Sequence, residues 1–108
     1  MGTEESLLDR DHLARQTYGD EALGRELLDL FAEQCRRLGP AIADEGRAAG
    51  DRADLAHTLK GSALGVGANR VAALANRVEA ALRAGEEEQA ALLVPVLQGV
   101  IGATVAVL

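Results

Sequence analysis

The sequence predicts an all-α fold, an antiparallel up-down four-helix bundle with a short additional N-terminal helix. Alanine and leucine supply 21 and 17 of the 108 residues, and both residues favour helices. The chain has one Phe, one Tyr and no Trp, so the aromatic residues that favour strands are nearly absent. Apolar residues recur at spacings of three and four, and the connections between these segments are short. We expect residues 1–108 to form a single domain, because this length provides one modest core.

The first part of the chain contains one short helical pattern. After six residues without periodicity, which we expect to be frayed, a helix is predicted from Asp9 to about Tyr18. Asp9 or Asp11 can cap it by accepting hydrogen bonds from the first free amides, and Gly19 can end it. Leu13 is expected to face the core. His12 lies among charged residues and is expected to be a solvated surface residue.

A longer helix is predicted from Asp20, its N-cap, to about Ala49, with Gly50 ending it. Pro40 lies within this segment, but the apolar pattern stays in phase across it, which indicates a kink and not an end. Cys35 is expected to pack in the core, because no neighbouring Lys or His would activate its thiol. The predicted buried stripe consists of Leu23, Leu27, Leu30, Phe31, Cys35, Leu38 and Ile42.

Two further helices follow. The first covers about 51–64, with Asp51 as its cap and a glycine-rich turn at residues 65–67. The next begins near Asn69 and ends at Gly85. Its predicted buried residues are Val71, Leu74, Val78, Ala81 and Leu82.

The last segment, residues 86–108, has no charged residue from Ala90 onward. Its length is compatible with a membrane span, but its larger and smaller residues fall on different sides of a helix, which favours a bundle helix. One side would carry Leu93, Val96, Leu97, Val100, Thr104 and Val107, and the other Pro95, Gln98, Gly99, Gly102 and Ala106. The small-residue side leaves self-association open. We otherwise expect a monomer.

Charge and composition exclude several classes of function. The 17 acidic and 11 basic residues give a net charge of −6, which disfavours nucleic acid and anionic membranes as partners. Neither a signal-peptide pattern nor a metal-ligand spacing is present, so we expect a cytoplasmic protein without a bound metal. Ten of the basic residues are Arg, and Lys60 is the single lysine.

The segment around His57 holds the residues most suited to chemistry. On a helix, His57 points roughly 160° away from Leu59, so it is expected to face water. Lys60 and Gly61 follow at i+3 and i+4 on the same surface. Lysine can attract a phosphoryl oxygen, and a helical glycine, which costs about 1 kcal/mol relative to alanine, leaves room for another molecule. Leu64 is also expected to be exposed, either for docking or incidentally. The inward side would carry Leu55, Leu59, Ser62, Ala63 and Val66.

The run H-T-L-K-G-S, with G-V-G after it, resembles the histidine-containing phosphotransfer (HPt) domain family. The family pattern is H-x-x-K-G-[SA] with a glycine about ten residues after the histidine. The residues that match are His57, Lys60, Gly61, Ser62 and Gly67. The neighbouring helices also resemble the family, so the resemblance covers about residues 9–105. The uncharged last helix departs from the family's usual pattern.

The resemblance implies that His57 is phosphorylated by a receiver-domain phospho-aspartate and passes the group to a second aspartate. It implies that Lys60 helps to stabilise the phosphoryl charge and that Gly61 leaves room for the receiver to approach. A Gln or Glu 22 positions after the histidine commonly faces the ring. Here that residue is Glu79, for which a merely solvated position is the alternative. We therefore predict two catalytic residues, His57 and Lys60, and four partner-binding residues, Gly61, Ser62, Leu64 and Glu79.

The resemblance implies a phosphocarrier of a multistep two-component phosphorelay, with response-regulator receiver domains, such as those of hybrid histidine kinases, as partners. We expect no cofactor in this chain, because Mg²⁺ would belong to the receiver. No GxxxxGK or GxGxxG motif is present, so we expect no ATP binding by this chain alone. One alternative is a non-catalytic adaptor that docks receivers or kinases. Another is the phosphoacceptor half of a histidine kinase, although Thr58 stands where an acidic residue is typical there.

Overall fold

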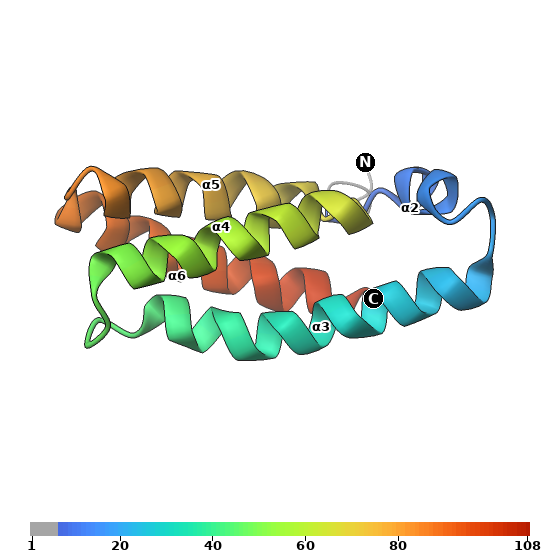
Figure 1. The fold of residues 1–108 in the computed structure, drawn as a ribbon, viewed down its shortest axis with the longest axis horizontal. Coiled ribbons are helices and arrows are strands. Elements are labelled where there is room, and N and C mark those ends of the chain that lie inside the picture. Colours follow the sequence, from blue (N-terminus) through green and yellow to red (C-terminus); the bar gives the residue numbers. More distant parts are fainter. Residues whose placement is uncertain (1–6) are drawn as a thin grey trace.

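The computed structural model describes residues 7–108, which form an all-α bundle (Figure 1). The first six residues, which we expected to be frayed, lie outside the described part. The helices in the described part are α2 (Arg10–Gln16), α3 (Glu21–Ala43), α4 (Ala49–Val66), α5 (Asn69–Arg83) and α6 (Glu87–Ala106). The long helices α3 to α6 run up and down in turn, and α2 lies at one end of the bundle. The predicted fold class is confirmed.

Each long helix packs against two neighbours. Helix α4 contacts α3 and α5, and α6 contacts the same two helices, so α4 and α6 lie at opposite corners of the bundle. The core between them is aliphatic, and burial of each large side chain contributes about 1.5–3 kcal/mol. The most deeply buried large aliphatic side chains in the described part are Leu8, Ile42, Leu59, Val71, Val78 and Leu97.

The predicted end of α3 was wrong. The helix passes through Pro40, as predicted, but stops at Ala43 and not at about Ala49. The Asp44 side chain accepts a hydrogen bond from the Gly46 amide at 2.9 Å. This local bond competes with helical hydrogen bonding and turns the chain. Gly50 consequently lies in the first turn of α4, where it does not end the preceding helix.

The N-terminal half of α3 buries a different face from the one predicted. The Asp20 carboxylate caps the helix by accepting from the Leu23 amide at 3.0 Å, as expected, but the Leu23 side chain is exposed. Leu30 is 64% exposed, and Leu28 is buried instead. Apolar residues at both 27–28 and 30–31 permit two stripes, and the packing of Gly24 against Leu13 of α2 selects one of them.

The core position of Cys35 is confirmed. The residue is buried among the aliphatic side chains of α3 and its neighbours. Burial raises the pKa of its thiol to about 11, and the charge of Arg36 opposes this shift only in part. The thiol therefore stays protonated at neutral pH and behaves as a small apolar group.

Helix α2 is anchored to the end of α4. Asp9 caps α2 by accepting from the His12 amide at 3.0 Å, and the Asp9 amide donates to the Gly67 carbonyl at 2.9 Å. Leu13 is buried, as predicted. The prediction for His12 was wrong: the side chain is half-buried, and its Nε2 atom is buried with no hydrogen-bond partner among residues 7–108. Its ring lies over Gly67, so the docking of α2 removes it from water.

Helix α4 is longer than predicted at both ends. It begins after Ala48, which has no side chain that could cap it, so Asp51 lies in the first turn and not at the cap. Gly65 is still helical, and the helix ends where Gly67 adopts a left-handed backbone with a φ of 85°. A left-handed residue at this position is a common helix end, and glycine adopts it without strain.

Helix α5 follows the prediction closely, from Asn69 to a turn closed by Gly85, except that Leu74 is only half-buried. Helix α6 is continuous through Pro95, but Val96, which we placed on the same side as Leu93 and Leu97, is exposed. Gln98, which we placed on the small-residue side, donates from its side-chain amide to the Gly39 carbonyl of α3 at 3.0 Å.

Among the described residues, α6 is the helix long and apolar enough to cross a membrane. A core helix of a bundle passes the same test of length and composition, and α6 packs against α3 and α5. Its buried residues are Ala90, Leu93, Val94, Leu97, Val100, Ile101 and Thr104.

Candidate functional site

His57 lies on the outward face of α4, and its side chain is 63% exposed. The opposite face of α4 enters the core through small residues and Leu59, which is fully buried. Ala53 and Ala56 carry that inward face together with Leu59, whereas Leu55, predicted to lie inward, is only half-buried. The small inward side chains let α4 lie close to α5, and this proximity determines what surrounds the imidazole.

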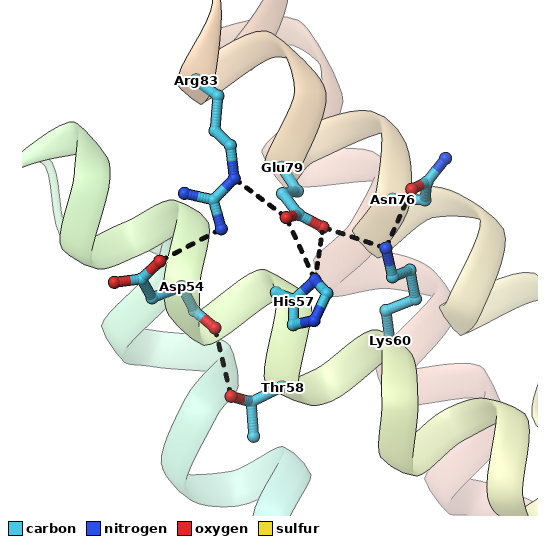
Figure 2. A network of polar contacts seen from close by, with 7 residues as sticks. All are labelled: Asp54, His57, Thr58, Lys60, Asn76, Glu79 and Arg83. Atoms are coloured by element: carbon cyan, nitrogen blue, oxygen red, sulfur yellow. Dashed lines mark hydrogen bonds and ion pairs between the residues drawn. The ribbon is translucent and has the colours of Figure 1, made fainter.

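Glu79 reaches His57 from α5. The His57 Nδ1 atom lies 3.1 Å from Glu79 Oε2 and 3.2 Å from Oε1 (Figure 2). The neighbouring Val78 and Leu82 are buried in the core, and this turns Glu79 toward the α4–α5 contact. Its side chain is 12% exposed, so the alternative of a merely solvated Glu79 is wrong.

Two cationic side chains hold the same carboxylate. Lys60 Nζ donates to Glu79 Oε1 at 3.1 Å and to Asn76 Oδ1 at 3.2 Å. Arg83 Nε donates to Glu79 Oε2 at 2.9 Å, and a terminal nitrogen of the same guanidinium donates to Asp54 Oδ1 at 3.1 Å. Figure 2 shows this network bridging α4 and α5 beside the imidazole.

The electrostatics keep Glu79 ionised. Burial raises the pKa of the carboxyl, but hydrogen bonds from Arg83, Lys60 and His57 outweigh this effect and lower the pKa to about 2. The hydrogen bonds to Glu79 and Asp54 in turn raise the pKa of Arg83. Because an ionised carboxylate can only accept a hydrogen bond, the proton between the two groups belongs to His57 Nδ1. The other ring nitrogen, Nε2, points away from Glu79.

The surface of α4 beyond His57 is open. A Cβ atom added at Gly61 or at Gly65 would meet nothing within 4 Å, so no contact within the described bundle calls for glycine at either position. Leu64 is 52% exposed, and Ser62 is half-buried. Between α3 and α4 lies a groove of about 520 Å³. Its lining includes Leu27, Leu30, Phe31, Ser62, Gly65 and Val66.

The structure thus brings His57, Lys60 and Glu79 together and places Gly61 beside them. Ser62 lines the groove, and Leu64 is exposed further along α4; neither belongs to the carboxylate network. Sequence reasoning missed Asp54, Asn76 and Arg83. The signal for the last two was present, because residues 76, 79 and 83 share one face of a helix.

Metal ligation finds no support in this region. Within residues 7–108, no group of three or more His, Cys, Asp or Glu side chains could hold a metal ion.

The family model for the Hpt domain matches residues 25–106, which covers nearly all of α3 and the whole of α4, α5 and α6. Comparisons with curated proteins and with solved structures give no match. Hpt domains are helical bundles that take part in histidine phosphotransfer in phosphorelays, and they generally interact with receiver domains. On the extent of this match, the chain belongs to the Hpt domain family.

Proposed function

We propose that this protein is a phosphocarrier that accepts a phosphoryl group on His57 from a receiver-domain phospho-aspartate and passes it to the aspartate of another receiver. The proposal rests on one observation: the Glu79 carboxylate contacts Nδ1 of the exposed His57 imidazole. With the proton held on Nδ1, the lone pair of the neutral ring is on Nε2, the nitrogen that points away from Glu79. A nucleophile is therefore presented on the open side of the bundle.

The transfer balances without a further reactant. The Nε2 lone pair attacks phosphorus, a nitrogen–phosphorus bond forms, and the bond from phosphorus to the aspartyl oxygen breaks, returning its electron pair to that carboxylate. The phosphorylated ring keeps its Nδ1 proton and carries a positive charge, which the Glu79 carboxylate offsets. Attack by a second carboxylate on phosphorus reverses the step and regenerates neutral His57.

Lys60 and Gly61 serve the phosphoryl group and the partner in this proposal. The Lys60 ammonium follows His57 by one helical turn and is 24% exposed, so it is available to the oxygens of a phosphoryl group on Nε2. Gly61 leaves space for a receiver to bring its aspartate to the ring. The chain itself needs no cofactor, because Mg²⁺ would arrive in the receiver's own site.

The receiver would extend from His57 over α4 toward α3. The α5 side of the imidazole is filled by the charged network, whereas the α3 side carries Ser62 and the groove lined by Leu30. Leu64 is exposed two turns after His57 on α4. Exposed leucines near a groove favour contact with another protein. These residues would give the receiver apolar contacts while His57 receives the phosphoryl group.

We place the protein in the cytoplasm as a monomer. Its net charge of −6 favours solubility, and Cys35 is a free thiol, as is usual in a reducing compartment. The exposed side of α6 carries Val96 and two helical glycines and keeps self-association open. Sedimentation at micromolar concentration distinguishes the two states.

The test is transfer from a phosphorylated receiver domain to this protein. We expect acid-labile, base-stable label on the wild type and none on His57→Gln. The matched control is His12→Gln, because His12 is the other histidine in the chain, and this variant should be labelled like the wild type. Label on His57→Gln equal to the wild type would refute the proposal. A wild type that binds the receiver but takes no label would identify the non-catalytic adaptor instead.

A further inference from the structure

The two oxygens of Glu79 have different cationic partners. Oε1 accepts from Lys60 at 3.1 Å, and Oε2 accepts from Arg83 at 2.9 Å. Both oxygens lie within 3.2 Å of His57 Nδ1. Lys60 and Arg83 therefore each hold one oxygen of the carboxylate that contacts the imidazole.

Lys60 turns toward the phosphoryl group in the proposed transfer. Its ammonium donates to Glu79 and Asn76, both on α5, so it lies on the side of the ring that carries Nδ1. A phosphoryl group would be bonded to Nε2, which points away from Glu79 (Figure 2). The third N–H of the ammonium is free for a phosphoryl oxygen, but to reach a group on the far side of the ring the flexible lysine turns away from α5, which weakens its bond to Glu79.

Arg83 has one partner on each of the two helices. Its guanidinium donates from Nε to Glu79 and from a terminal nitrogen to Asp54, so the planar fork is fixed at both ends. Asp54 lies one turn before His57 on α4, and Arg83 therefore ties α5 to the same helix that carries the imidazole. None of these contacts has to break when a phosphoryl group arrives on Nε2.

We propose that Arg83, anchored by Asp54, is the positioning residue that keeps Glu79 on His57 Nδ1 while Lys60 moves to the phosphoryl group. This inference rests on the proposed function. Arg83 contacts neither the phosphoryl group nor the receiver, and acts only through Glu79. Without Arg83, once Lys60 has turned away, the ring is the one remaining cationic partner of Glu79, and the carboxylate is held at Nδ1 less rigidly.

The direction in which an Arg83 variant shifts the titration of the phosphorylated ring distinguishes a positioning role from a simple charge effect. Phosphate is installed on His57 with phosphoramidate, a small-molecule donor, so that no receiver is needed. Ring ¹⁵N shifts then give the pH at which the phosphorylated ring loses its Nδ1 proton. Removing the Arg83 charge alone would raise that pH, because a nearby cation disfavours a protonated ring. Losing the carboxylate that holds the proton would lower it.

We expect Arg83→Met to lower this pH by about one unit. Asp54→Asn should lower it less, and Arg83→Lys should fall between Arg83→Met and the wild type. Arg77→Met, which removes an exposed arginine from the same helix, is the matched control and should leave it unchanged. In unphosphorylated Arg83→Met the Nδ1–H tautomer should persist, because Lys60 still holds Glu79.

An unchanged or raised pH in Arg83→Met overturns the inference, as does loss of the Nδ1–H tautomer before phosphorylation. If Arg83→Met does not fold, Asp54→Asn carries the same test, because the anchor is removed while the guanidinium stays. Failure of the proposed function has a different signature: wild-type protein would take no phosphate from a phosphorylated receiver, whatever these titrations show.

Discussion

His57 and Glu79 are 22 residues apart in the chain, and His57 Nδ1 lies 3.1 Å from Glu79 Oε2. The tight turn around Gly67 makes α4 and α5 antiparallel neighbours, so side chains that point toward the shared boundary can meet across it. Glu79 belongs to α5 and its two cations come from both helices. The orientation of the imidazole therefore depends on the register of two helices and not on α4 alone.

The charge on Glu79 makes the site sensitive to acid. The pKa of its carboxyl is about 2 in the folded protein, below the ordinary 4.5, so the ionised form stabilises the fold above pH 4.5. That contribution is lost as the pH falls from 4.5 toward 2. At pH 7 the wild type should exceed Glu79→Gln in free energy of unfolding by on the order of 1 kcal/mol, after screening by solvent. Urea unfolding at pH 7, 5 and 3 should show more than half of the difference gone at pH 3, and a constant difference would contradict this.

Lys60 is expected to matter more for transfer than for folding. Lys60→Ala removes a cation from a partly exposed ion pair, which changes the free energy of unfolding by no more than about 1 kcal/mol. Transfer from a phosphorylated receiver should slow at least about tenfold, equivalent to 1.4 kcal/mol of barrier. Rapid-quench labelling and urea unfolding measure the two effects. Arg47→Ala, in the exposed turn between α3 and α4, is the control and should change neither the transfer rate nor the free energy of unfolding. Unfolding of Lys60→Ala at room temperature would show that the residue has a structural role instead.

Gly61→Ala should raise stability and lower activity. An added Cβ meets nothing within 4 Å, and alanine is about 1 kcal/mol better than glycine within a helix. The same methyl group would stand where the receiver approaches His57. Gly99→Ala on α6 is the matched control, since a Cβ there also meets nothing and α6 lies at the opposite corner from α4. We expect both variants to melt at higher temperature and only Gly61→Ala to transfer more slowly. Equal transfer rates would exclude close approach of the partner at Gly61.

Gly67→Ala should destabilise the protein. The residue has a φ of 85°, and an added Cβ would lie 2.7 Å from the Asp9 carbonyl oxygen. The left-handed backbone alone costs alanine about 1 kcal/mol, and the contact with the backbone oxygen forces α2 away from α4. We expect a loss of about 2 kcal/mol or more in urea unfolding. Gly65→Ala, two residues earlier and with open space around its Cβ, should not lose stability. Equal effects at the two positions would show that α2 does not depend on this contact.

Helix boundaries show where prediction from sequence stops. Asp20 was predicted as a cap because cap chemistry acts on the next turn of the same helix, and for α2 the same reasoning left Asp9 or Asp11, of which the structure selects Asp9. We predicted the end of α3 too late in the chain, because we expected the helix to continue to about Ala49. The Asp44 side chain instead accepts a hydrogen bond from the Gly46 amide, and the helix ends before it. Leu28 is buried and Leu30 is exposed because α2 packs against one face of α3. The position of α2 cannot be predicted from the apolar pattern of α3.

By itself, the sequence determined the all-α class, the approximate helices, the outward direction of His57 and the placing of Lys60 and Gly61 beside it. All of these follow from the 3.6-residue period, which relates residues of one helix to each other. Only the tertiary structure decided that Glu79 meets Nδ1, and that Arg83 and Asp54 join it. Periodicity gives the face of a helix and not its axial register against a neighbour. Here that register is set by the packing of small side chains between α4 and α5.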